Sequence, residues 1–206
     1  IGDRGKRDLA QDLNYHNGKI LRLTLEGKPA TGNPFENTKN ALPEIWSYGH
    51  RNPQGIDLDP ITNEIYSIEF GPRGGDELNL IQKSKNYGWP VITYGKEYWG
   101  PSIGDTHKEG MQQPVLHWTP SISPSGMAFY NSEKYSHWKN SLFLAALGSR
   151  HLRRLELKEN KVTSEEMFFS DLNERIRHVR ISPEGNLYFS TDSGKLMKVE
   201  KSVNKS

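Results

Sequence analysis

The stretch that decides the fold is residues 51–70, which read RNPQGIDLDPITNEIYSIEF. An arginine opens it, a short strand candidate ends in Asp-Pro, a tight turn follows, and a second strand candidate contains Ile-Tyr. Residues 177–192, RHVRISPEGNLYFSTD, repeat this plan with Ser-Pro at the turn and Leu-Tyr in the second strand. Residues 125–146 form a looser third copy with a longer insertion. Such recurrence predicts a repeat of small antiparallel sheets, as in a β-propeller.

The rest of the chain also has the character of an all-β protein. Its 19 glycines and 12 prolines punctuate short apolar stretches, and the long Ala, Leu, Glu and Lys runs of helices are missing. We expect strands at residues 20–25, 45–48, 56–58, 64–70, 77–82, 126–130, 141–147, 151–157, 162–169, 176–181, 187–191 and 195–200. Residues 83–118 carry few periodic signals and are expected to be irregular. The alternative fold is a β-sandwich whose hairpins resemble one another by chance.

The composition argues against several classes of protein. The 27 basic and 25 acidic residues nearly cancel and are scattered, whereas a nucleic-acid-binding domain more often shows a basic stripe. Without cysteine, neither a disulfide nor a thiolate metal site can form. No apolar run approaches the ~20 residues of a membrane-spanning helix. The chain opens at Ile1 without a signal peptide, so we interpret it as part of a longer or processed protein.

The first stretch with chemical potential is residues 49–55, GHRNPQG, which follow a strand candidate. Arg51 offers a planar fork of donors that suits carboxylates, and Asn52 offers both a donor and an acceptor. At the end of a strand these side chains would bind a planar anionic ligand. The alternative is a turn fixed by Asn52-Pro53, with Arg51 in a surface ion pair.

The second stretch is residues 70–77, FGPRGGDE. Its glycines and proline predict a tight loop with exposed carbonyl oxygens, and the carboxylates of Asp76 and Glu77 follow at once. Calcium takes carbonyl and carboxylate oxygens alike as ligands, so the loop is a candidate calcium site. The alternative is a solvated acidic turn.

An aromatic cluster follows in the irregular region. Residues 86–90 read NYGWP, and Tyr94, Tyr98 and Trp99 come soon after. Aromatic rings in a loop above a cleft can stack on a sugar or on a flat cofactor. The alternative is that these rings cover the end of a core.

Two arginines stand further along the chain, at Arg175 and Arg177. Because side chains alternate along a strand, they project to the same side and could bind a polyanion. The alternative is a pair of surface salt bridges, which contribute little to stability. The seven histidines show no metal-ligand spacing, and we interpret them as structural.

Taken together, the motifs GHRNPQG, EFGPRGGDELNLI and NYGWP resemble, in order and spacing, those of the glucose/sorbosone dehydrogenase family. Members of this family include soluble sugar dehydrogenases that depend on pyrroloquinoline quinone (PQQ). Matches at residues 1–5, 18–22, 33–35 and 175–177 extend the resemblance over nearly the whole chain. It implies an all-β, six-bladed β-propeller, of which residues 1–206 would form a single domain covering about the last four blades.

The resemblance also implies PQQ and calcium as cofactors. The positions that match PQQ contacts are Arg51, Asn52, Tyr98, Ser121, Arg175 and Arg177. The carbonyls of Gly71 and Pro72 match those that hold the calcium of the cofactor. Glu77 and Tyr87 match a second, structural calcium site of some members.

The implied activity is the oxidation of aldose sugars to lactones by a periplasmic or secreted enzyme, which could be a homodimer. The catalytic base of the family is a histidine upstream of the motif at Ile1, so no catalytic residue is expected here and the chain alone would be inactive. Residues 148–150 replace a lysine that contacts PQQ in some members, and Phe70 stands where a polar side chain is common. The alternative function is a non-catalytic propeller that serves as a binding module.

Overall fold

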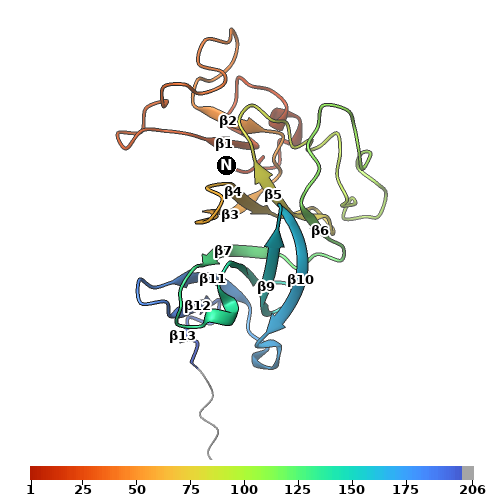
Figure 1. The fold of residues 1–206 in the computed structure, drawn as a ribbon. Helices are drawn as coiled ribbons and strands as arrows, with labels where there is room; N and C mark the ends of the chain where they lie inside the picture. Colours follow the sequence, from red (N-terminus) through yellow and green to blue (C-terminus); the bar gives the residue numbers. More distant parts are fainter. Residues whose placement is uncertain (201–206) are drawn as a thin grey trace, which may run out of the picture. The chain divides into compact units, whose positions relative to one another are not determined.

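The computed structural model describes residues 1–200 and is almost entirely β within them (Figure 1). Three short 3₁₀ helices interrupt the strands: η1 (Arg7–Ala10), η2 (Ser136–Trp138) and η3 (Ser170–Leu172). The strands are β1 (Lys19–Leu21), β2 (Ile45–Tyr48), β3 (Pro53–Leu58), β4 (Ile65–Glu69), β5 (Asp76–Ile81), β6 (Leu116–Trp118), β7 (Pro124–Tyr130), β8 (Ser141–Ala146), β9 (His151–Lys158), β10 (Lys161–Phe168), β11 (Ile176–Ile181), β12 (Leu187–Thr191) and β13 (Leu196–Lys198).

These strands form four small sheets of hydrogen-bonded neighbours. The sheets are β1-β2, β3-β4-β5-β6, β10-β9-β8-β7 and β11-β12-β13. Strands that follow one another along the chain lie side by side in each sheet, so each sheet is a simple meander. Four separate meanders are typical of propeller blades, whereas a sandwich distributes its strands over two sheets.

Most of the predicted strands have nearly the predicted bounds. Strands β2, β11 and β12 agree with the prediction at both ends. Strand β1 is shorter than predicted, because the chain beyond it leaves the sheet and exposed Leu23 makes only an isolated bridge to Pro29. Strand β6 was not predicted, since its three residues are too short to show a periodic pattern.

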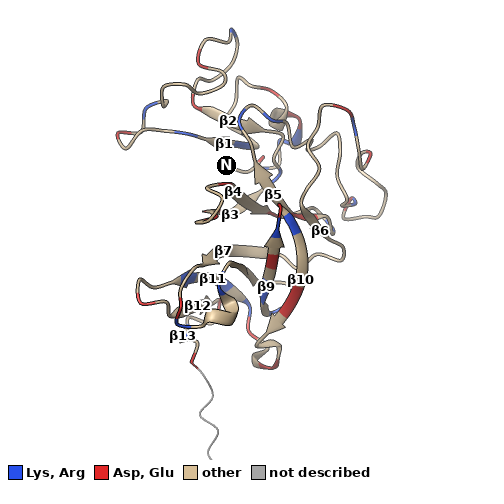
Figure 2. Ribbon diagram, viewed as in Figure 1, with Lys and Arg blue, Asp and Glu red and all other residues tan. Residues whose placement is uncertain are grey.

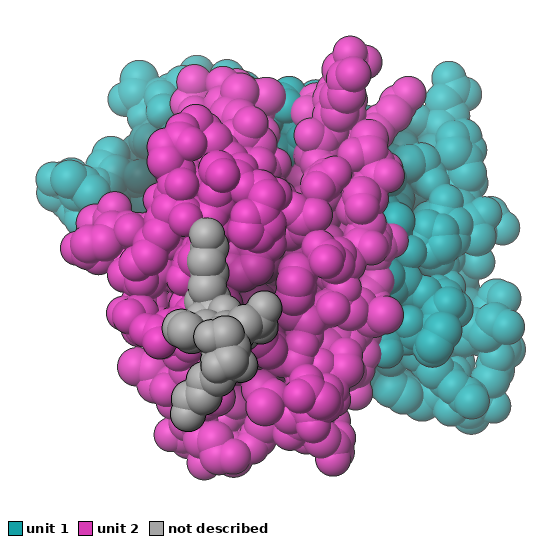
Figure 3. Space-filling model, turned by 60° about the horizontal axis from the view of Figure 1, so that its bottom comes forward, with its two compact units in different colours: residues 1–56, 64–121 teal, residues 57–63, 122–206 magenta. Residues whose placement is uncertain are grey.

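The chain divides into two compact units (Figure 3). One comprises residues 1–56 and 64–121, and the other comprises residues 57–63 and the chain from residue 122 onward. The core of the second unit is rich in aromatic side chains. Tyr130, Phe143 and Phe189 are buried there, and Trp138 meets Phe143 edge-on with ring centroids 5.2 Å apart. Aromatic pairs in this geometry stabilise a core beyond the area they bury.

Strands β9 and β10 carry both basic and acidic positions (Figure 2). Arg153 pairs with Glu165 on β10, and Arg154 pairs with Glu156 and with Glu166. These pairs offset the positive charges of Arg153 and Arg154, which argues against a nucleic-acid surface on these strands. Within residues 1–200, no helix has the length and apolar character needed to cross a membrane.

Candidate functional site

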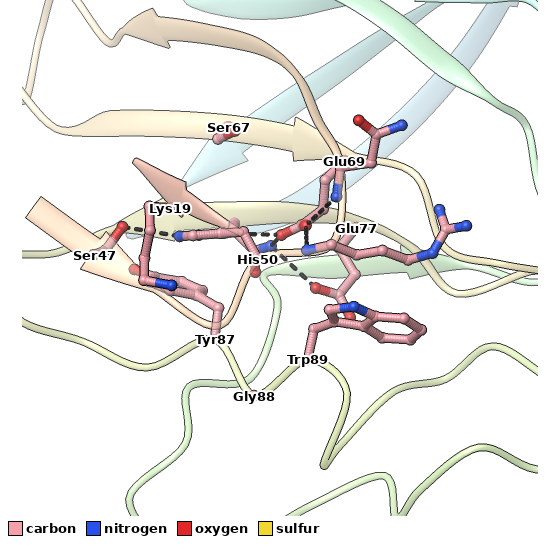
Figure 4. A network of polar contacts seen from close by, with 12 residues as sticks. Lys19, Ser47, His50, Ser67, Glu69, Glu77, Tyr87, Gly88 and Trp89 are labelled. Carbon is pink, nitrogen blue, oxygen red and sulfur yellow. Dashed lines mark hydrogen bonds and ion pairs between the residues drawn. The ribbon is translucent and has the colours of Figure 1, made fainter. Parts of the chain in front are cut away.

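The centre of the candidate site is the turn between β2 and β3, where Arg51 and Asn52 stand. The backbone N–H groups of both residues donate to the same carboxylate oxygen, Oε2 of Glu69, at 2.7 Å and 3.3 Å (Figure 4). A glycine is required just before them, because a Cβ at Gly49 would lie 2.2 Å from Oδ1 of Asn86. The turn is thus held through its backbone by one buried side chain.

A buried histidine completes this support. His50 is fully buried; its Nδ1 lies 3.1 Å from Oε1 of Glu69 and its Nε2 lies 2.8 Å from Oγ of Ser47. Its ring stacks on Tyr87 with centroids 4.5 Å apart. Burial alone would raise the pKa of Glu69, but the charge of His50 and the hydrogen bonds that Glu69 accepts outweigh burial and lower the pKa. Glu69 therefore remains an anion that binds the turn.

The guanidinium of Arg51 is held by neutral groups. Its Nη1 donates to the carbonyl of Phe70 at 2.8 Å and its Nη2 donates to the Tyr98 hydroxyl at 3.3 Å. The group also lies above the ring of Trp89, 5.5 Å from its centroid. None of these contacts neutralises the positive charge of Arg51. The side chain is therefore fixed in a position suited to an anionic ligand.

The loop at residues 70–77 is folded around Asp76, which is fully buried. One oxygen of this carboxylate accepts the N–H of Gly71 at 2.9 Å and the other accepts the Ser121 hydroxyl at 2.6 Å. Only glycine fits at position 71, because a Cβ there would lie 2.0 Å from the carbonyl oxygen of Gly74. Asp76 is buried, so the alternative of a solvated acidic turn is wrong for this residue. The contacts of Asp76 and the close approach at Gly71 therefore fix the path of the loop.

Glu69 and Glu77 stand opposite each other in the register of β4 and β5. Like charges in such a pair repel. The side-chain N–H₂ of Asn79 lies between them and donates to Glu69 Oε1 at 2.8 Å and to Glu77 Oε2 at 3.0 Å. Burial, and then the charge of Glu69, raise the pKa of Glu77 to about 8. Oδ1 of Asn79 is buried and has no hydrogen-bond partner among the described residues.

The carboxylate oxygens of Glu69 and Glu77 and the side-chain oxygen of Asn79 carry negative charge or partial charge that would attract a cation. A small cavity lies beside them, with about 10 Å³ open to the centre of a water-sized sphere, enough for a single water or ion. Glu77 and Tyr87 both line this cavity. The Tyr87 hydroxyl donates to the Leu80 carbonyl and accepts the N–H of Gln82, so it is already engaged with the backbone of β5 and of the residue that follows it. Within residues 1–200, no cluster of three or more His, Asp or Glu side chains could hold a metal ion.

The second unit carries the predicted pair of arginines. Nε of Arg175 donates to Oδ2 of Asp192 at 2.9 Å, and Nε of Arg177 donates to Oδ1 of the same carboxylate at 2.7 Å. Both side chains project to the same side, as predicted, and both are about half exposed. One carboxylate faces two guanidinium groups, so the cluster keeps a positive charge. Nearby, Arg150 donates to the side-chain oxygen of Asn173 at 2.8 Å.

The predicted aromatic cluster divides into two groups. Tyr87 and Trp89 are buried, and Trp89 donates its indole N–H to Asp3 at 2.8 Å. For these two rings the alternative, that they cover a core, is correct. Tyr98 and Trp99 are 66% and 76% exposed at the tip of a turn that is closed by a hydrogen bond from Gly100 to residue 97.

Comparison with known proteins places the chain in a family. The model of the family described as Glucose / Sorbosone dehydrogenase matches residues 1–198. The chain belongs to the glucose/sorbosone dehydrogenase family. The aldose sugar dehydrogenase YliI of Escherichia coli is 45% identical to it over 204 residues, which are 97% of this chain and 55% of that protein. The chain therefore spans about half the length of this relative.

Solved structures of relatives agree with this assignment. A glucose dehydrogenase crystal structure is 45% identical, with a TM-score of 0.95 over 98% of this chain and 60% of that one. The PQQ-bound aldose sugar dehydrogenase of Streptomyces coelicolor is 31% identical, with a TM-score of 0.76 over 96% of this chain and 56% of that one. The predicted fold, an all-β chain that forms part of a glucose/sorbosone dehydrogenase propeller, is confirmed.

Sequence reasoning identified Asp76 with the loop at residues 70–77, but it missed the other residues that support the site. Glu69, Asn79 and Ser47 are polar, buried and placed in strands, where no conspicuous motif marks them. One signal was present: a glutamate closes strand β4, which reads IYSIE and whose four last residues are all buried. A charged side chain in such a strand requires a partner.

Proposed function

We propose that this chain is part of a PQQ- and calcium-dependent dehydrogenase that oxidises aldose sugars to lactones. The observation that carries the proposal is the Arg51 guanidinium, which carbonyl and aromatic groups hold in place without neutralising its charge. Family membership supports it, because relatives bear the names of sugar dehydrogenases and one was solved with PQQ bound.

The chemistry of the donor groups fits PQQ, which carries several carboxylates. Arg51, Arg175 and Arg177 would each offer N–H donors to a carboxylate, and arginine is well suited to this geometry. Asn52, Tyr98 and Ser121 are the other proposed contacts, although here the Ser121 hydroxyl donates to Asp76 and the Tyr98 hydroxyl accepts from Arg51. PQQ, when bound, would accept the hydride of the sugar, while the protein would orient both molecules.

Calcium fits the oxygen donors of the same unit. The carbonyls of Gly71 and Pro72 stand on the loop that Asp76 fixes, and we propose that they hold the calcium of the cofactor. A second calcium would bind Glu77 together with the backbone carbonyl of Tyr87, since the Tyr87 hydroxyl is already engaged. The buried Asn79 oxygen without a hydrogen-bond partner among the described residues and the raised pKa of Glu77 support this second site. A cation would interact favourably with that oxygen and would lower the pKa of Glu77 by stabilising its carboxylate.

The remaining functional features would come from the whole protein. The group that removes the proton from the sugar is proposed to be a histidine preceding Ile1 in the family pattern, so residues 1–206 alone would be inactive. The other proposals are a periplasmic or secreted location, a homodimer and a separate electron acceptor.

The test is a dye-reduction assay on the product of the complete gene, reconstituted with PQQ and calcium and supplied with several aldoses. Sugar-dependent reduction that requires both additions is expected, and parallel reactions without PQQ or with a chelator serve as controls. Absence of sugar-dependent reduction with every aldose would refute the proposed activity. If calorimetry also showed no binding of PQQ, the chain would instead be a non-catalytic propeller that binds another ligand.

A further inference from the structure

The side chain of Glu69 stands between the two groups of residues that the proposed function uses. Its Oε2 accepts the backbone N–H groups of Arg51 and Asn52, and its Oε1 lies within hydrogen-bond distance of His50 and Asn79 (Figure 4). The hydrogen bonds to this buried carboxylate are charge-assisted, and such bonds are stronger than those of an exposed, solvated carboxylate. The orientation of the turn at residues 51 and 52 therefore depends on where this one carboxylate lies.

The position of Glu69 is itself determined by the sheet. It is the last residue of β4, it is 4% exposed, and it pairs in register with Glu77 on β5. His50 contacts the carboxylate through Nδ1, and its own position is fixed by the contact with Ser47 and by stacking on the ring of Tyr87. The carboxylate therefore has little freedom to move, and it transmits the geometry of β4 and β5 to the turn.

We infer that Glu69 is a positioning residue that sets the anion-binding geometry of Arg51 and Asn52, and that this role outweighs its own repulsion of an anionic ligand. The inference rests on the proposed function, in which Arg51 and Asn52 contact the carboxylate-bearing cofactor. Asn79 extends the same support to Glu77, because its N–H₂ group donates to both carboxylates.

The two roles of a negative charge at position 69 predict opposite results. Acting through space alone, the carboxylate would repel an anion, so Glu69→Ala would tighten binding and Glu69→Asp would leave it nearly unchanged. If the carboxylate acts by its position, both substitutions would weaken binding. Alanine removes the acceptor, and the shorter aspartate withdraws it from the two N–H groups. Charge and placement are therefore separable with two variants.

The experiment measures the dissociation constant of PQQ by calorimetry in excess calcium, on the product of the complete gene. We expect Glu69→Ala and Glu69→Asp to raise it by roughly ten-fold or more, because hydrogen bonds to a charged group are among the stronger ones. Glu44→Ala is the matched control, since Glu44 belongs to another Glu–His pair, with its Oε1 2.5 Å from Nε2 of His16, and its side chain makes no hydrogen bond to residues 49–55 in the described part of the chain. This control should bind PQQ as the unsubstituted protein does.

Hydrogen–deuterium exchange of residues 49–55 provides a readout that does not depend on the cofactor. The amides of Arg51 and Asn52 should exchange at least about ten-fold faster in Glu69→Ala, and at an unchanged rate in Glu44→Ala. Unchanged exchange, or PQQ affinity that is equal or higher in both Glu69 variants, would overturn the inference and leave the proposed function standing. No PQQ binding by the unsubstituted protein would instead refute the proposed function, while the exchange rates would still decide whether Glu69 holds the turn.

A variant that fails to fold does not end the test. Glu69→Gln keeps the length of the side chain and an oxygen for the two N–H groups, but it loses the charge. We expect its dissociation constant for PQQ to lie above that of the unsubstituted protein and below that of Glu69→Asp. A value lower than that of the unsubstituted protein would show that repulsion by the charge outweighs positioning, and it would contradict the inference.

Discussion

Replacement of Glu77 by glutamine should change how the stability of the metal-free protein depends on pH. Burial and the charge of Glu69 raise the pKa of Glu77 from its ordinary 4.5 to about 8 in the folded state. Between these two pH values the folded protein keeps a proton that the unfolded chain has lost. The free energy of unfolding therefore falls as the pH rises through this range, by up to about 5 kcal/mol if the whole difference in pKa is realised.

Glu77→Gln removes this titration and preserves an oxygen that can accept the hydrogen bond from Asn79. We expect the variant and the unsubstituted protein to be about equally stable at pH 5, and the variant to be more stable at pH 8 by at least about 2 kcal/mol. Urea unfolding in a chelator at several pH values measures the difference. Calcium at pH 8 should stabilise the unsubstituted protein and have little effect on the variant. A stability difference that is the same at pH 5 and pH 8 would refute the reasoning.

Three further predictions follow from the contacts of the first unit. Arg51→Lys should weaken PQQ binding by roughly ten-fold or more in calorimetry, because a lysine cannot contact the Phe70 carbonyl and a carboxylate with one planar fork; equal affinity would contradict the role of Arg51. Lys19→Met should lower the free energy of unfolding by about 2–4 kcal/mol in urea, since the buried ammonium donates to the carbonyls of residues 9, 10 and 17, and a change below 1 kcal/mol would argue against that role. Ser121→Ala should cost about 1–2 kcal/mol in the same assay by leaving one oxygen of Asp76 without its hydroxyl donor, whereas Ser121→Thr should retain most of the stability.

The hairpins of the fold were predictable because their signals are local. In residues 51–70 and 177–192 a turn with proline separates two apolar stretches, and each stretch became a strand pair, β3-β4 and β11-β12. A turn sequence and two flanking patterns are enough for such a prediction. Strand β6 has no comparable signal, and it forms because its three residues find a partner in β5.

The candidate site was predictable only in part, for a related reason. Arg51, Gly71 and Glu77 belong to conspicuous loops and strand ends, so their chemistry is visible in the sequence. The pairing of Glu69 with Glu77 depends on the register of β4 and β5, which a sequence does not reveal. His50 has no metal-ligand neighbour in the sequence, and its importance comes from Glu69, which lies 19 positions away.

The contact between Glu69 and the turn has a consequence for how this region can change over evolutionary time. The carboxylate accepts hydrogen bonds from backbone N–H groups, and every amino acid except proline has a backbone N–H group. Side chains at positions 51 and 52 can therefore be exchanged without dismantling the support beneath them. A lineage, or an engineer, could vary the ligand that this turn recognises while the underlying frame of Ser47, His50 and Glu69 stays in place.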